Sequence, residues 1–178
     1  MTIAFAVVRA PSISEIRIIT PTAHNENRGA IWTSYSADQL DGLIPEKLKF
    51  KHDKFSISKH NVLRGIHGDH KSWKLVSCVH GAVMQVVVDL RKDSPTYLLH
   101  EVFDIGAHNH TMILIPPGFG NAFYVKSENA TYHYKLAYDG AYADVSEQFT
   151  VAWNDPSINI KWPTSTPILS NRDARVVE

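Results

Sequence analysis

The stretch Val62-Leu63-Arg64-Gly65-Ile66-His67-Gly68-Asp69 combines strand-forming residues with two glycines and two side chains that can do chemistry. In a regular strand, Arg64 and His67 would point to opposite faces, because they are an odd number of residues apart. A glycine inside a strand often marks a β-bulge, which redirects the side chains around it. We therefore predict a bulge at Gly65 that turns Arg64 and His67 into one interior.

The chemistry of these two side chains suggests an anionic substrate beside a general base. Histidine exchanges a proton near neutral pH. Arginine binds a phosphate or carboxylate group through two parallel hydrogen bonds. The same pair would also fit a hydrogen-bonded histidine at a strand end beside a surface cation, so the motif alone leaves both interpretations open.

Short β-branched and aromatic runs recur along the chain between turn signals, which is typical of a sandwich or barrel. The expected strands are Glu15–Thr20, Ala30–Tyr35, Lys49–Ser58, Asn61–His67, Lys74–Val79, Ala82–Arg91, Tyr97–Ile105, Met112–Ile115, Ala122–Val125 and Thr131–Tyr138. Ala37–Leu43 is expected to form a short helix capped by Ser36. Pro156, Pro163 and Pro167 favour an irregular C-terminal segment that wraps over the body.

Composition narrows the possible partners and compartments. The 178 residues are 44% hydrophobic, which suits one domain over 1–178. Eighteen basic residues balance eighteen acidic ones, so the net charge indicates neither nucleic acid nor an anionic membrane as a partner. The single cysteine, Cys78, excludes an intrachain disulfide. Because Met1–Val8 lacks the features of a secretory leader and no long apolar stretch follows, we expect a cytoplasmic protein.

A series of motifs in order along the chain resembles the dTDP-4-dehydrorhamnose 3,5-epimerase family. The segments that carry the resemblance are 62–67, 74–76, Val88-Asp89-Leu90-Arg91, Ser94-Pro95-Thr96, Ile115-Pro116-Pro117-Gly118-Phe119, Tyr134-Lys135, Trp153-Asn154-Asp155-Pro156, Ile160-Lys161-Trp162-Pro163 and Leu169-Ser170-Asn171-Arg172-Asp173. They span about Arg28 to Asp173, which is nearly the whole chain. An ordered set of this size is far more specific than one short pattern.

The resemblance implies an all-β, cupin-type β-jelly roll with a few short helices, which forms a homodimer and works without a metal or other cofactor. It also implies epimerisation of a nucleotide-linked 4-keto sugar. A ketone at C4 acidifies the hydrogens on C3 and C5, so a base can remove one and an acid can return a proton to the opposite face. Family members typically exchange an N-terminal strand, for which Glu15–Thr20 is the candidate.

By resemblance, His67 is the base and Asp173 orients it, since a carboxylate fixes the tautomer of an imidazole and raises its basicity. Tyr134 matches the tyrosine on the other face of the sugar, the proton donor, and its ordinary pKa of about 10 keeps it protonated. Lys74 corresponds to a lysine near the keto oxygen, and Asp89 to an aspartate expected to hold that lysine. From the residues alone, Tyr134 could equally be a core aromatic residue, and Lys74 and Asp89 a structural ion pair.

Other matched positions concern the substrate. Arg64 and Arg28 correspond to arginines that contact the sugar and its diphosphate. Where the family usually has a histidine, this chain has Asn121, which can donate a hydrogen bond to an oxyanion but cannot move a proton. Where the family often shows glutamine and asparagine around an aspartate, this chain has His52 and Lys54. The combination of His67-Gly68-Asp69 after Arg-Gly-Ile, Asn121 and the segment 50–55 is similar to a smaller branch of this family. That resemblance implies a GDP-linked 4-keto heptose of bacterial capsule synthesis as the substrate.

Four alternatives remain open. The substrate could be a dTDP-4-keto-6-deoxyglucose. A related sugar cupin that moves a keto group between C3 and C4 is a second possibility, although the usual Arg-Gly-x-His-x-His is absent. A cupin that binds a nucleotide sugar without turnover is a third. A metal site is a fourth, but His67 and His70 are separated by two residues, so the His-x-His spacing expected of cupin metal ligands is missing.

Overall fold

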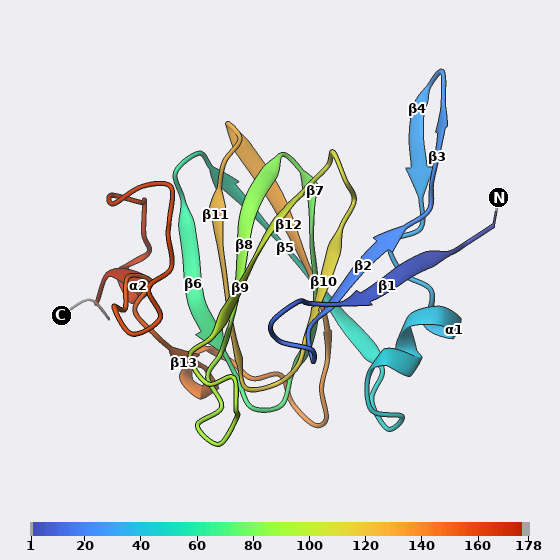
Figure 1. Cartoon of the computed structure of the whole chain (residues 1–178). Coiled ribbons are helices and arrows are strands. Elements are labelled where there is room, and N and C mark those ends of the chain that lie inside the picture. Colours follow the sequence, from blue (N-terminus) through green and yellow to red (C-terminus); the bar gives the residue numbers. More distant parts are fainter. Residues whose placement is uncertain (1, 176–178) are drawn as a thin grey trace.

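Two antiparallel β-sheets face each other in the computed structural model of the chain, which describes residues 2–175 (Figure 1). The six-stranded sheet has the order β1 (Phe5–Arg9), β2 (Arg17–Pro21), β10 (Met112–Ile115), β7 (Trp73–His80), β12 (Asn129–Ala137) and β5 (Phe50–Lys59). The five-stranded sheet has the order β13 (Phe149–Thr150), β6 (Leu63–Gly68), β11 (Phe119–Val125), β8 (Ala82–Asp89) and β9 (His100–Gly106). The hairpin of β3 (Ala23–Glu26) and β4 (Gly29–Trp32) projects from the body.

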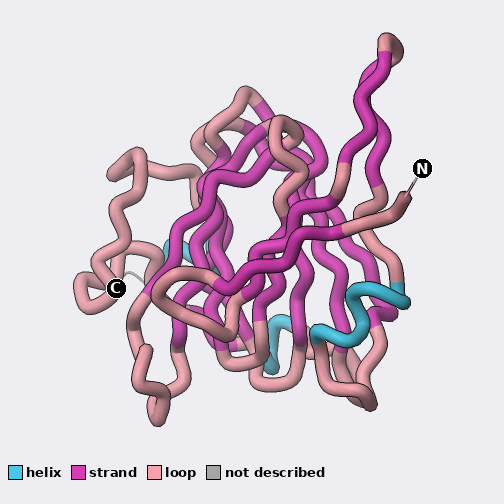
Figure 2. The backbone as a smooth tube through the Cα atoms, turned by 45° about the vertical axis from the view of Figure 1, so that its right-hand side comes forward, coloured by secondary structure: helices cyan, strands magenta, loops and turns pink. Residues whose placement is uncertain are grey.

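Helical structure is confined to short pieces, as Figure 2 shows. They are α1 (Ala37–Leu40), the 3-10 helices η1 (Asp41–Leu43) and η2 (Val145–Glu147), and α2 (Asn171–Ala174). The expected helix over Ala37–Leu43 is confirmed as α1 followed by η1. Ser36 occupies the N-cap position, but its side chain makes no capping hydrogen bond, so its predicted capping role is wrong. No helix among residues 2–175 has the length and apolar character needed to cross a bilayer.

The two-residue period of the strands divides the apolar side chains among three layers. In β8, Val83 and Val87 point between the sheets, whereas Val86 and Val88 point to the outer face of the five-stranded sheet. The C-terminal segment covers that outer face with side chains such as Ile158, which confirms the expected wrap. On the other side, α1 and η1 cover the outer face of the six-stranded sheet.

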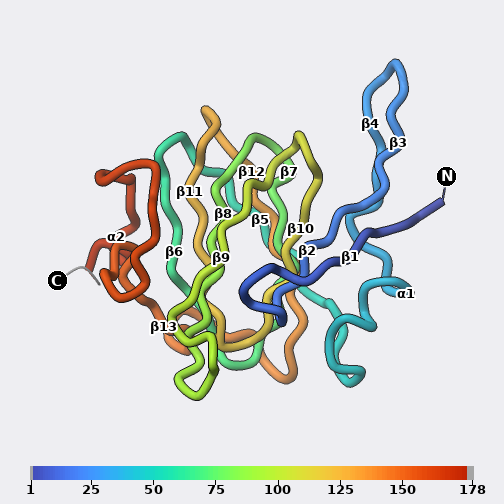
Figure 3. The backbone as a smooth tube through the Cα atoms, viewed as in Figure 1, coloured from blue at the N-terminus to red at the C-terminus, as the bar shows by residue number. Residues whose placement is uncertain are grey.

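The ten expected strands are confirmed, with ends that differ by a few residues. Strands β1, β3 and β13 were not expected. Strand β1 is a continuous apolar run, β3 is mostly polar and exposed, and β13 has only two residues, so none shows a clear alternation. Figure 3 traces how β13 returns late in the chain to lie beside β6.

The predicted bulge in β6 is confirmed by its pairing with β11. His67 lies opposite Asn121 and Arg64 opposite Phe123, so an interval of three residues on β6 faces an interval of two on β11. Because Asn121 and Phe123 are two residues apart, their partners share one face. Gly65 has a φ of +127°, a conformation that side chains other than glycine rarely adopt. Arg64 and His67 therefore point to the same side of the sheet.

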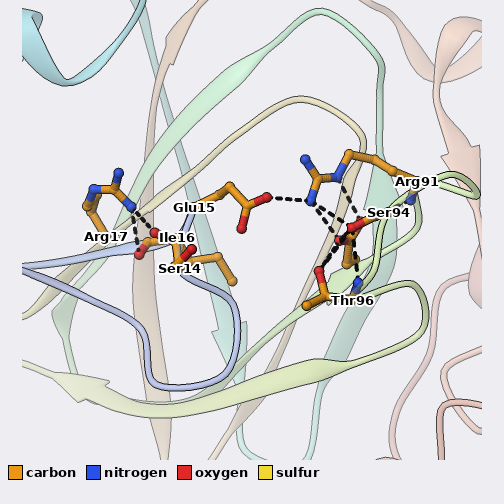
Figure 4. Close-up of polar contacts among 8 residues, drawn as sticks. Ser14, Glu15, Ile16, Arg17, Arg91, Ser94 and Thr96 are labelled. Atoms are coloured by element: carbon orange, nitrogen blue, oxygen red, sulfur yellow. Dashed lines mark hydrogen bonds and ion pairs between the residues drawn. The ribbon is translucent and has the colours of Figure 1, made fainter.

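A polar network anchors the end of β8 to the loop before β2, as Figure 4 shows. Asp89 is fully buried and accepts hydrogen bonds from Arg91 Nη2 at 2.7 Å, Ser94 Oγ at 2.5 Å and Thr96 Oγ1 at 2.6 Å. Arg91 also donates to Glu15 at 3.0 Å. Burial alone would raise the pKa of Asp89, but hydrogen bonds from the guanidinium and the two hydroxyl groups hold it well below its usual range.

The bulge makes Gly65 intolerant of a side chain. A Cβ added there would lie 2.5 Å from the Ala122 Cβ, in addition to the strain of the positive φ. We expect Gly65→Ala to lower the free energy of unfolding by about 2–4 kcal/mol, measured by urea denaturation. Gly42→Ala is the matched control, because a Cβ at Gly42 meets nothing within 4 Å. Equal stability of the two variants would contradict this account of the bulge.

The Asp89 network gives a stability that depends on pH. Because the pKa of Asp89 is lower in the folded chain than its unfolded value of about 3.9, its stabilisation is complete above that pH and is lost as the pH falls toward the folded value. We expect Asp89→Asn to cost about 2–4 kcal/mol at pH 7, and its difference from the wild type to shrink between pH 4 and pH 2 in urea titrations. Glu15→Gln, at the exposed end of the network, is the control and should change the free energy of unfolding little. If the loss of stability in Asp89→Asn were the same at every pH, the proposed role of the carboxylate would be refuted.

Candidate active site

A cavity of about 100 Å³ lies between the two sheets and is lined by half of the ten site residues predicted from the sequence. It is lined by Lys54, His67, Gly68, Asp69, Ser72, Lys74, Asn121, Tyr134, Leu136, Tyr142 and Gln148. Five of these are predicted site residues: Lys54, His67, Lys74, Asn121 and Tyr134. They come from β5, β6, β7, β11 and β12, so both sheets contribute to the walls.

His67 and Asp173 form a hydrogen-bonded pair at the wall made by the five-stranded sheet. His67 Nε2 lies 2.5 Å from Asp173 Oδ1, and the His67 side chain is 26% exposed while that of Asp173 is 2% exposed. A carboxylate on Nε2 holds the proton there and leaves the lone pair of a neutral imidazole on Nδ1. None of the groups in residues 2–175 hydrogen-bonds to Nδ1. The pair thus has the arrangement of an oriented general base.

Asp173 is itself held in place by its neighbours. Ser170 caps α2: its hydroxyl donates to Asp173 Oδ2 at 2.9 Å and accepts from the Asp173 N–H at 3.1 Å. The Gly65 N–H of the bulge lies near the carboxylate and favours its ionised form. Burial alone would raise the pKa of Asp173, but the hydrogen bond and charge of His67, with Ser170 and Gly65, lower it below its usual value. The carboxylate is therefore ionised at neutral pH.

Tyr134 lines the cavity from β12, on the six-stranded sheet and therefore on the wall opposite His67. Burial raises the pKa of Tyr134 to about 12, and the nearby charge of Arg64 partly opposes this shift. The phenol is consequently protonated at neutral pH. A group able to accept a proton and a group able to donate one thus stand on facing walls of one cavity.

The lysine of the cavity is paired with a carboxylate that differs from the expected one. Lys74 Nζ lies 3.2 Å from Asp69 Oδ2, and both side chains are buried. Asp69 also accepts backbone hydrogen bonds at 3.0 and 2.6 Å from the turn that follows it. The prediction that Asp89 holds Lys74 is wrong, because Asp89 is occupied by Arg91 and its hydroxyl partners. Burial lowers the pKa of Lys74, and Asp69 counteracts this.

Asn121 has its side-chain amide oriented by a buried polar chain. Gln85 Nε2 donates to Asn121 Oδ1 at 2.6 Å, and the Tyr132 hydroxyl donates to Gln85 Oε1 at 2.5 Å. Gln85 and Tyr132 are both fully buried. Since the amide oxygen is used, Nδ2 is the group that Asn121 has left for a ligand in the cavity. This is the donor expected of an asparagine facing an oxyanion.

Lys54 extends into the cavity from β5, where its ammonium donates to the Tyr142 hydroxyl at 3.0 Å. His52 lies outside the lining, with Nδ1 3.3 Å from the Tyr138 hydroxyl and its ring 4.9 Å from that of Tyr142. The basic and aromatic side chains of β5 and of the loop after β12 therefore form one cluster beside the cavity. Electrostatics and stacking surfaces of this kind suit a nucleotide diphosphate.

The two arginines lie in different places. Arg64 is on the cavity side of β6, donates to Ser58 Oγ at 2.9 Å and is close enough to Tyr134 to affect its pKa. Arg28 lies in the turn of the projecting β3–β4 hairpin, where it pairs with Glu26 and is 85% exposed. Within this one chain, Arg28 is not brought to the cavity.

Several lining residues were not assigned a role from the sequence. Asp69 closes the opening stretch and could have been found by noting that it precedes the Lys74 strand by a short turn. Tyr142 and Gln148 lie in an irregular loop, where no periodicity indicates which side chains face inward. Among the described residues, no group of three or more histidine, cysteine, aspartate or glutamate side chains is placed to hold a metal ion.

The chain is similar to dTDP-4-dehydrorhamnose 3,5-epimerases along nearly its whole length, and the family of that description matches residues 10–178. The dTDP-4-dehydrorhamnose 3,5-epimerase of Salmonella typhimurium is 37% identical over 172 residues, covering 94% of this chain and 92% of that protein. The dTDP-4-dehydrorhamnose 3-epimerase of Streptomyces niveus is 35% identical over 169 residues, covering 93% and 80%.

The fold is shared with solved structures of the same kind. A dTDP-6-deoxy-D-glucose-3,5-epimerase of Legionella pneumophila, in complex with dTDP-4-keto-L-rhamnose, superposes with a TM-score of 0.88 at 32% identity, covering 97% of this chain and 91% of that one. NovW of Streptomyces spheroides, a 4-keto-6-deoxy sugar epimerase, superposes with a TM-score of 0.87 at 34% identity, covering 96% and 85%. The chain therefore belongs to the dTDP-4-dehydrorhamnose 3,5-epimerase family, and it is a cupin-fold isomerase that epimerises a nucleotide-linked 4-keto sugar.

Proposed function

We propose that the chain is a 3,5-epimerase of dTDP-4-keto-6-deoxyglucose. The observation that carries this proposal is the placement of the His67–Asp173 pair and Tyr134 on facing walls of one cavity. Epimerisation needs a base and an acid on opposite faces of the sugar ring, whereas binding without turnover needs neither. The dTDP nucleotide is supported by the names of the relatives, which include enzymes described with dTDP sugars and TDP. The GDP-heptose and capsule expectation has no support from these relatives.

In the proposed mechanism, the lone pair on His67 Nδ1 takes the proton from C3 or C5, and Asp173 stabilises the imidazolium that forms. The electrons move onto the C4 oxygen as an enolate. Lys74 and the Asn121 amide supply a cation and a hydrogen-bond donor for that oxygen. Tyr134 then delivers a proton to the carbon from the other face. The positive charge of the imidazolium is thus stabilised by Asp173, and the negative charge of the enolate oxygen by Lys74 and Asn121.

For the diphosphate we propose Arg64 of β6, whose charge is close to Tyr134, and Lys54 of β5, which lines the cavity. Arg64 offers a planar fork that suits phosphate oxygens, and Lys54 offers a point charge. His52 stands behind Lys54, against the tyrosines of the loop after β12. Asp89 is not part of this proposal, because both of its oxygens are engaged away from the cavity.

We further propose that the protein forms a homodimer through the outer face near edge strand β5. Phe55 and Ile57 are 60% and 76% exposed on this strand, and large apolar side chains on an exposed sheet edge favour association. Glu15–Thr20, the segment expected to be exchanged, overlaps β2, which pairs on both sides within its own chain. The projecting β3–β4 hairpin, which carries Arg28, is the better candidate for contact with a second copy.

The base assignment predicts a separation of binding from chemistry. In D2O with dTDP-4-keto-6-deoxyglucose, the wild type should incorporate deuterium at C3 and C5 by NMR. His67→Asn should lower this exchange by about 10²–10⁴-fold while the dissociation constant of dTDP changes little, because the nucleotide contacts lie elsewhere. Retained exchange in the variant would remove His67 from the role of base. A moved keto group in the wild type would instead indicate a ketoisomerase.

The dimer proposal predicts a concentration-dependent mass. Sedimentation velocity over a tenfold or larger dilution should show a dimer for the wild type, and Ile57→Lys should shift it toward monomer because a charge would be buried at the contact. Leu99→Lys, another exposed apolar residue distant along the chain from β5, is the control. A wild-type monomer at all concentrations would end the proposal, as would an unaffected dimer in Ile57→Lys.

A further inference from the structure

A second tyrosine faces the cavity that holds the proposed base and acid. Tyr142 lies in the irregular loop between β12 and η2 and lines the cavity together with His67 and Tyr134. Its oxygen accepts a hydrogen bond from Lys54 Nζ at 3.0 Å. A phenol oxygen that accepts from a cation keeps its own O–H free to donate. No acceptor among residues 2–175 takes the Tyr142 proton.

We propose that Tyr142 is a second proton donor, which protonates the one of C3 and C5 that Tyr134 does not serve. This inference rests on the proposed epimerase function and goes beyond it by assigning the chain two acids for two inversions. It also commits the chain to inversion at both carbons.

The need for two donors follows from the positions of the reacting atoms. C3 and C5 lie on opposite sides of the C4 ketone, so a donor within hydrogen-bond reach of one carbon is displaced from the other. One tyrosine could serve both only if the sugar moved between the steps. Two phenols fixed in one cavity remove that requirement for the proton donor, whereas the base, His67, serves both carbons. Each has a cation beside it: Arg64 near Tyr134, and Lys54 on the Tyr142 oxygen.

The loop that carries Tyr142 is hydrogen-bonded to α2, the helix that contains Asp173. Arg172 Nη1 donates to Gln148 Oε1 at 3.1 Å, and Gln148 Nε2 donates to the carbonyl oxygen of Ala143 at 2.9 Å. Arg172 is the neighbour of Asp173 in α2. One short helix therefore holds His67 through Asp173 and the Tyr142 loop through Arg172. These contacts fix the position of the base relative to the second donor.

The proposed step balances in protons and electrons. His67 takes the proton from carbon, and the C–H electron pair becomes the enolate. The enolate carbon then forms a new C–H bond with the Tyr142 hydroxyl hydrogen, and the O–H electron pair stays on the phenolate beside the Lys54 ammonium. Solvent takes the proton from the imidazolium and returns one to the phenolate. No oxidant or cofactor enters the step.

The test compares Tyr134→Phe, Tyr142→Phe and the wild type with dTDP-4-keto-6-deoxyglucose in D2O, resolving inversion and exchange at C3 and C5 separately by NMR. We expect each variant to lose inversion at a different carbon by about 10-fold or more in kcat, with KM within about threefold of the wild type. Tyr124→Phe is the matched control: it removes a hydroxyl bonded to Asn61, outside the cavity. Phenylalanine preserves the ring, and thermal melting checks folding.

A second variant separates proton donation from packing. Lys54→Met removes the cation from the Tyr142 oxygen, and we expect its kcat to fall at the same carbon as in Tyr142→Phe. Its KM should rise as well, because Lys54 is also proposed to bind the diphosphate, and Lys54→Arg should restore both. If the wild type inverts both carbons and Tyr142→Phe leaves both rates within about twofold, the inference is overturned and the epimerase function stands. A wild type that inverts one carbon only also overturns it. A wild type without any exchange overturns the proposed function and the inference together.

Discussion

One extra residue in β6 is the constraint on which the site depends. The bulge at Gly65 places Arg64 and His67 on the same side of the five-stranded sheet, although their spacing in a regular strand would separate them. The backbone N–H of the same glycine lies close enough to Asp173 to favour its ionised form. The irregularity thus both aims the imidazole into the cavity and favours the carboxylate that orients it. A regular strand would supply neither.

Several polar side chains that line the cavity are each held by a hydrogen-bonded or oppositely charged partner. Lys74 has Asp69, His67 has Asp173, and the Asn121 amide has Gln85. Because these groups are fixed before a substrate arrives, little reorganisation is needed when negative charge develops on the sugar oxygen. Lys54 differs from this pattern, since its contact in the cavity is a phenol rather than a carboxylate. Its positive charge is left to meet an anionic ligand.

The fold was largely predictable from the sequence because a two-residue alternation and turn residues mark most of the strands, and the bulge followed from one glycine. The pairing of His67 with Asp173 was predicted from the resemblance of their two motifs to the family, and the structure places the two side chains in contact. The prediction for Asp89 was wrong because the sequence pattern of one charge among valines does not indicate its partner. That partner is Arg91, two residues further along the chain, and not Lys74. Tyr142 was missed because a loop has no period to show which side chains turn inward.

The His67–Asp173 contact joins residues 106 positions apart. The segment between β13 and α2 that delivers Asp173 is attached to the sheet by a small apolar layer around Ile158 and by the backbone hydrogen bonds of Ile168 with Asn61 and Leu63. Such a segment is a unit that can detach in a local opening of lower free energy than global unfolding. On heating, the base would then lose its orienting carboxylate while the two sheets remained intact. Thermal inactivation of this enzyme would precede its melting, and the gap between the two temperatures would report how firmly that wrap is held.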